Sequence, residues 1–166
     1  MSLEQRVRSD RQLARLLQIG VVLEEVVEAR AYHHFRDLSR EERDAMDATI
    51  AALLDEAVEK SAEHRERLEA IIDDLEADSV PFEEIEALVR KQYGQTKPED
   101  FDGILYDQLN GEETAYKFYD DLIAAIDGSD ADFSVDSEYV LAELRAIRDE
   151  EEEGVREVTA VMEERD

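Results

Sequence analysis

Four side chains of metal-binding type interrupt the apolar stripes of four long helical segments: Glu25, His64, Glu112 and Glu151. In each segment apolar residues recur at steps of three and four, which keeps one face of a helix inward, and the four side chains occupy that face. An isolated ionised carboxylate is very costly in a core unless it is paired or bound to a metal. The spacing therefore predicts that the four meet in one bundle core, either as a metal site or as a buried cluster of hydrogen bonds.

The stripes that carry these side chains fall in separate segments of the chain. They read Gln18, Val22, Glu25, Ala29, Tyr32; Leu54, Ala57, Ser61, His64, Leu68, Ile71, Leu75; Leu105, Leu109, Glu112, Tyr116, Tyr119, Ile123, Ile126; and Val140, Leu144, Ile147, Glu151, Gly154, Val158, Val161. No run alternates convincingly with period two, so the pattern predicts an all-α fold without a sheet.

Punctuating residues give the expected boundaries. Ser39 with Glu42, and Thr96 with Glu99, have capping-box spacing, and Gly94 and Gly128 are of the type that ends helices. We expect helices over 3–37, 39–76, 81–93, 96–127 and 135–164, with a loop over 129–134. The tight turn near 38 and the short loop at 129–134 predict two antiparallel hairpins. The long link between them, with its own short helix, predicts a B–C crossover, so that residues 1–166 form a single four-helix-bundle domain.

Charge and composition narrow the function classes. The chain of 166 residues has 46 acidic and 19 basic residues, a net charge of −27, which disfavours nucleic acid and anionic membrane surfaces as partners. Arg outnumbers Lys 15 to 4, and the acids are spread along periodic helices, as expected for a halophilic protein working in high salt. Cysteine is absent, which excludes thiolate chemistry. Without a signal-like segment or an apolar run of roughly 20 residues, we expect a cytoplasmic protein.

The two predicted hairpins repeat one pattern, and the pattern resembles a known family. Glu25 precedes Tyr32 by seven residues, as Glu112 precedes Tyr119, and Ser61/His64 match Glu151/Gly154 in an i, i+3 pair. The ordered set resembles the ferritin-like superfamily, the rubrerythrin-like branch most closely. That resemblance implies a bundle in which two helices each give a Glu, and two others each give a Glu-x-x-His pair, to two irons.

The chain departs from the family pattern at two positions. Ser61 stands where the resemblance implies a Glu, and Gly154 where it implies a His. The remaining ligands, Glu25, His64, Glu112 and Glu151, favour one metal per chain over two. Oxygen ligands with one imidazole suit Fe or Mn. Three further residues could hydrogen-bond the ligands from outside the metal's coordination sphere, although the two tyrosines are more simply explained as ordinary core aromatics: Tyr32, Tyr119 and Ser61.

The resemblance implies a metal-binding protein which, if active, is an oxidoreductase acting on O2 or peroxide. Because the chain has no cysteine, its electrons would come from a separate donor, and we expect a homo-oligomer, a dimer. The sequence assigns no catalytic residue. The alternative is a degenerate bundle without metal that serves as a structural or interaction protein, with its inward acids paired to arginines such as Arg30, Arg65 or Arg145.

Overall fold

The computed structural model describes residues 7–36, 39–45, 48–76, 87 and 101–165, with only the backbone described at some of them, including 32–36. These residues form four long helices and one short helix. They are α1 (Asp10–Arg36), α2 (Arg40–Ala45), α3 (Ala48–Asp74), α5 (Phe101–Asp127) and α6 (Ser137–Arg165). No strand occurs in the described part of the chain. The predicted all-α class is confirmed.

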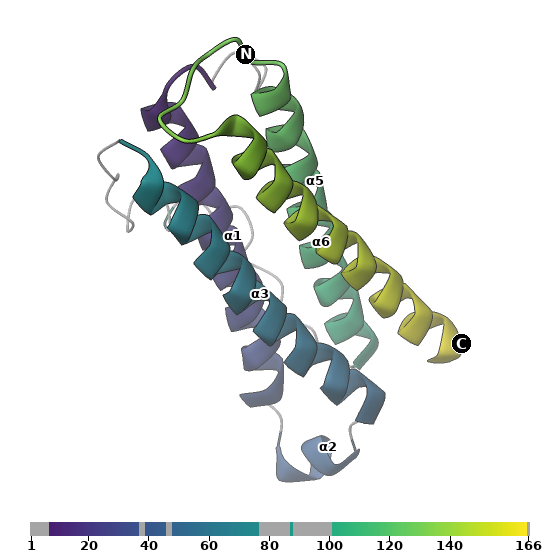
Figure 1. Cartoon of the computed structure of the whole chain (residues 1–166). Helices are drawn as coiled ribbons and strands as arrows, with labels where there is room; N and C mark the ends of the chain where they lie inside the picture. Colours follow the sequence, from purple (N-terminus) through teal and green to yellow (C-terminus); the bar gives the residue numbers. More distant parts are fainter. Residues whose placement is uncertain (1–6, 37–38, 46–47, 77–86, 88–100, 166) are drawn as a thin grey trace.

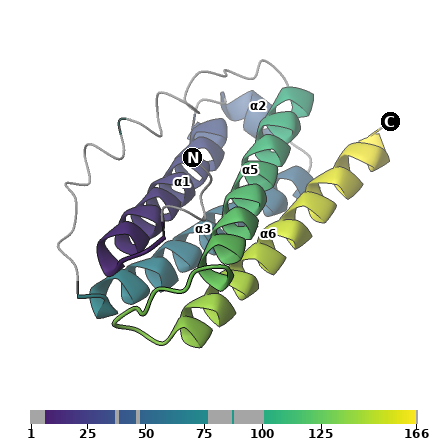
Figure 2. The same ribbon diagram turned by 90° about the horizontal axis from the view of Figure 1, so that it is seen from above.

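The four long helices pack side by side as a bundle (Figures 1 and 2). α1 packs against α3 and α5, and α6 packs against α5 and α3. Within each hairpin the helices are antiparallel, whereas α3 and α5 run in the same direction (Figure 1). Consequently α3 ends and α5 begins at opposite ends of the bundle. The predicted short helix over 81–93 lies outside the described residues, so the crossover helix stays a prediction.

The expected single helix over 39–76 is wrong, because α2 does not continue the line of α3 (Figure 1). α2 reads Arg-Glu-Glu-Arg-Asp-Ala, and its described side chains at 40, 41 and 44 are exposed. A segment without an apolar face gains nothing by extending the bundle, because the stability of protein helices comes mostly from packing such a face. Capping-box spacing predicted where a helix starts, and could not predict where its axis turns.

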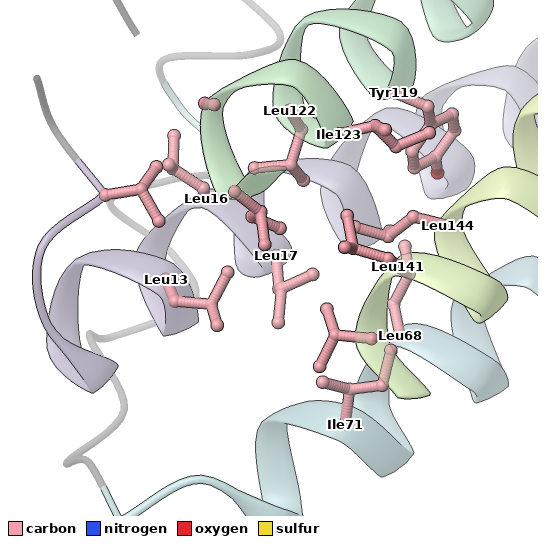
Figure 3. Packing of buried hydrophobic residues seen from close by; sticks show 14 of the residues in the cluster. Leu13, Leu16, Leu17, Leu68, Ile71, Tyr119, Leu122, Ile123, Leu141 and Leu144 are labelled. Carbon is pink, nitrogen blue, oxygen red and sulfur yellow. The ribbon is translucent and has the colours of Figure 1, made fainter. Parts of the chain in front are cut away.

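Two apolar clusters fill most of the bundle core. The larger one gathers residues such as Leu17, Leu68, Leu122 and Leu144 between the long helices (Figure 3), toward the end of the bundle where α5 ends and α6 begins. The smaller one includes Ile50, Leu54, Leu105 and Val158 toward the other end. Burial of such side chains contributes roughly 1.5–3 kcal/mol each and is the main force that aligns the helices.

Between the two clusters lies a level of buried polar side chains, here called the polar layer. It sits between the clusters along every long helix and consists of Glu24, Ser61, His64, Gln108, Glu112 and Glu151. None of the described helices is long and apolar enough to cross a membrane.

Candidate metal centre

Three helices bring one potential metal ligand each to the middle of the polar layer. Glu24 of α1, His64 of α3 and Glu151 of α6 are all buried, and one ligand atom of each lies within 4.8 Å of the others. His64 Nδ1 is 3.3 Å from Glu24 Oε1 and 3.0 Å from Glu151 Oε1. The imidazole thus lies between two carboxylates, the arrangement that a small cation needs to gather three donors.

The structure corrects the expected position on α1, because Glu24 and not Glu25 faces this cluster. Glu24 is fully buried, whereas the Glu25 side chain is 33% exposed and lies 3.8 Å from Arg65. Apolar residues come in adjacent pairs along α1, such as Leu16–Leu17 and Val21–Val22. Either member of each pair satisfies the helical period, so the expected stripe was one residue out of register.

The far side of the imidazole is held by a residue that the sequence did not single out. His64 Nε2 lies 3.0 Å from Glu150 Oε2, and Glu150 also accepts a hydrogen bond of 3.0 Å from Arg67 Nη1. Arg67 in turn donates through Nε to Glu143. When Nε2–H donates to Glu150, Nδ1 is left to face the cluster, which is how outer carboxylates orient a histidine ligand. The only feature of the sequence that pointed to this contact was the position of Arg67, one turn after His64.

Glu112 is buried beside the three-residue cluster but is not part of it. Its Oε1 accepts a hydrogen bond of 2.8 Å from Gln108 Nε2, one turn earlier on α5. It also hydrogen-bonds Glu151. The structure therefore brings Glu112 and Glu151 together as expected, with Glu112 in contact with a candidate ligand.

The residues expected to support the ligands have different outcomes. Tyr119 is fully buried and donates a hydrogen bond of 2.6 Å to Glu24 Oε1, so it does hold a carboxylate of the cluster. Ser61 is buried on the same face of α3 as His64. The side chain of Tyr32 lies outside the described part of the structure. Arg65 pairs with Glu28, and Arg30 pairs with Asp107, whose side chain is only 6% exposed.

Electrostatics in the polar layer favour protons on Glu151 and on His64. Burial, the Glu24 charge and the hydrogen bond with Glu112 raise the pKa of Glu151 well above its usual range. Burial alone would lower the pKa of His64, but the carboxylates of Glu24 and Glu150 outweigh it and raise that pKa. Burial and the Glu24 charge also raise the pKa of Tyr119, which stays a neutral donor. The layer therefore holds protons where a cation would otherwise lie.

One buried atom in the layer is left without a hydrogen bond. Glu24 Oε2 has no hydrogen-bond partner among the described residues, although its side chain is fully buried. Leaving a buried carboxylate oxygen unsatisfied costs about 1–3 kcal/mol or more. A cation among Glu24, His64 and Glu151 would satisfy this oxygen, as would the proton of Glu151, which also hydrogen-bonds Glu24. The donor set therefore fits a metal, which would take the place of that proton.

No family model, curated protein or solved structure matches the chain.

Proposed function

We propose that this chain is a metal-binding helical bundle with one Fe(II) or Mn(II) ion held by Glu24, His64 and Glu151. The observation that carries the proposal is the convergence of three buried donor atoms within 4.8 Å, one from each of three helices. It is also supported by Glu24 Oε2, a buried oxygen that accepts no hydrogen bond from an N–H or hydroxyl group of the described residues.

The choice of metal follows from the donor types. Two carboxylates and one imidazole are ligands that suit Fe(II) and Mn(II), and without cysteine the chain offers no soft thiolate. A single imidazole lies in the polar layer, and Glu112 is engaged by Gln108, so one ion per chain is the stoichiometry that the donors support. Binding would displace the proton of Glu151 and leave Nδ1 of His64 as a neutral donor.

The ferritin-like, rubrerythrin-like resemblance remains part of this proposal. It is supported by the four-helix bundle with parallel α3 and α5, and by one acid or imidazole from each long helix in the polar layer (Figure 1). Bound iron or manganese would supply one-electron chemistry toward O2 or peroxide. The chain's own part is to hold Glu24 through Tyr119 and to fix the His64 tautomer through Glu150. A separate donor would supply the electrons.

Adjacent glutamates allow a matched test. Wild type, Glu24→Gln and Glu25→Gln are purified in molar KCl without chelator, analysed for metal, and titrated with Mn2+. Wild type and Glu25→Gln should bind about one ion per chain, and Glu24→Gln should lose at least tenfold in affinity, because only Glu24 belongs to the buried cluster. Equal loss in both variants would place the ligand elsewhere.

The structural or interaction protein without metal is the second candidate. The observation that favours it is the set of protein hydrogen bonds around the layer, from Tyr119 to Glu24, from Gln108 to Glu112 and between His64 and Glu150. Such bonds satisfy much of the layer without an ion. If wild type and both variants purify metal-free and take up neither Fe(II) nor Mn(II), this second candidate replaces the first.

A further inference from the structure

Gly154 lies on α6 one turn after Glu151 and faces Glu112 of α5. A Cβ atom built at residue 154 would lie 2.7 Å from Glu112 Oε2 and 2.9 Å from Glu112 Cδ. Real Cβ atoms do not approach other heavy atoms so closely. The Glu112 carboxylate therefore occupies the space that a side chain at 154 would need, and we call this space the Glu112 niche.

In the metal-free protein two hydrogen bonds hold the carboxylate in the niche. Gln108 Nε2 donates to Glu112 Oε1 at 2.8 Å, and Glu112 also hydrogen-bonds Glu151. Glu112 is only 8% exposed, so solvent does not substitute for these partners. Glu151 is thereby contacted by Glu112 on one side, while its Oε1 lies 3.0 Å from His64 Nδ1 on the other.

We propose that Gly154 is a positioning residue of the metal centre: its missing side chain admits the Glu112 carboxylate to the surface of α6 one turn from Glu151, and the packing of Glu112 there restricts Glu151 to orientations that direct it toward His64. The metal part of this inference rests on the proposed function, because it takes Glu151 as a ligand. A glycine inside a long helix is disfavoured relative to alanine, so its presence in α6 calls for such a reason.

The niche is tested first in metal-free protein, by a double-mutant cycle on thermal unfolding. Gly154→Ala is made in wild type and in Glu112→Ala. In the Glu112→Ala background the new methyl group meets no carboxylate, so alanine should raise the melting temperature by its helix preference. In wild type the gain should be smaller or reversed, because Glu112 must move. Equal shifts in the two backgrounds would show that no niche exists.

Metal affinity then tests the positioning role. Gly154→Ala should lower Mn2+ affinity about tenfold or more, the usual consequence of disturbing a residue that orients a ligand, and should add nothing in the Glu112→Ala background. Gly111→Ala is the matched control, because a Cβ there would meet only Val27 Cγ2, at an ordinary 3.4 Å. It should leave the affinity unchanged.

The possible results separate the two proposals. Unchanged Mn2+ affinity in Gly154→Ala would overturn the positioning role while leaving the metal site intact. A wild type that takes up no Mn2+ would overturn the proposed function and the metal part of this inference together, and the thermal cycle would still decide whether Glu112 occupies the niche.

Discussion

The larger apolar cluster and the polar layer are adjacent levels of the same bundle, yet they contribute to the stability of the fold in opposite ways. Around Leu17, Leu122 and Leu144 the side chains of the cluster are apolar, and their burial is favourable without any fixed direction (Figure 3). In the adjacent polar layer, Glu24, His64 and Glu151 each need a directed partner, and Glu24 Oε2 has no N–H or hydroxyl donor among the described residues. Replacing buried ionic groups by apolar ones is often neutral or stabilising. The apolar cluster thus accounts for the fold, and the polar layer is where a function is to be sought.

The largest expected effect comes from a cavity in the apolar cluster. Leu144 is fully buried, so Leu144→Ala should lower the free energy of unfolding by about 2–5 kcal/mol, from lost burial and the cavity left behind. Chemical denaturation monitored by circular dichroism measures this loss. Tyr106, which is 67% exposed, offers a control, since Tyr106→Ala should change stability by less than about 0.5 kcal/mol. Comparable losses in the free energy of unfolding of the two variants would contradict a stabilising role for the apolar cluster.

A smaller loss should follow from removing one hydrogen bond in the polar layer. Tyr119→Phe keeps the ring in the core but takes the donor from Glu24 Oε1, and should cost about 1–3 kcal/mol in metal-free protein. It should also weaken Mn2+ binding, because Glu24 loses the group that fixes it. Tyr139→Phe, at a position 43% exposed, should do neither. If Tyr119→Phe stabilised the protein, the bond to Glu24 would be absent in solution.

The protons held in the polar layer predict how metal affinity depends on pH. The pKa values of Glu151 and His64 are both raised, so both groups keep their protons to higher pH than usual, and a cation must displace them. Mn2+ affinity should therefore increase with pH, by up to about tenfold per pH unit for each proton displaced. The metal-free fold should behave oppositely. Raised pKa values stabilise the folded state at low pH, and this contribution is lost as the pH rises through them. Titrations at several pH values would show a flat affinity if the protons lie elsewhere.

The smallest effect on stability per side chain should come from the exposed carboxylates. Each surface charge contributes less than about 1 kcal/mol, but with a net charge of −27 their mutual repulsion should lower the melting temperature as KCl is removed. Salt screens charges in solvent far more than charges in the core. Wild type and Glu24→Gln should therefore show the same salt dependence. A melting temperature that does not change from molar KCl to low salt would refute the halophilic interpretation.

The sequence predicted the long helices well and their relative register poorly. Steps of three and four residues are a local property, so the stripe of α3 from Leu54 through His64 to Ile71 is buried as expected. On α1 the paired apolar residues leave two neighbouring stripes equally acceptable, and the structure selects Glu24 over Glu25. That choice depends on how α1 rotates against α3 and α5, which no local pattern records.

The contacts across the polar layer could not be predicted from the sequence for the same reason. Glu150 and Gly154 were each recognisable, one as an acid in a run and the other as a helix glycine. Which residues they contact, His64 for Glu150 and Glu112 for Gly154, depends on the axial position of α6 relative to α3 and α5. Axial offsets of this kind are set by the packing of many apolar side chains together.

The polar layer draws its residues equally from the two hairpins. Glu24 and His64 come from α1 and α3, whereas Glu112 and Glu151 come from α5 and α6. A cation held by Glu24, His64 and Glu151 would cross-link one half of the molecule to the other, so its binding energy would oppose their separation. Removing the ion would then weaken the interface between the two hairpins before it unwound any single helix.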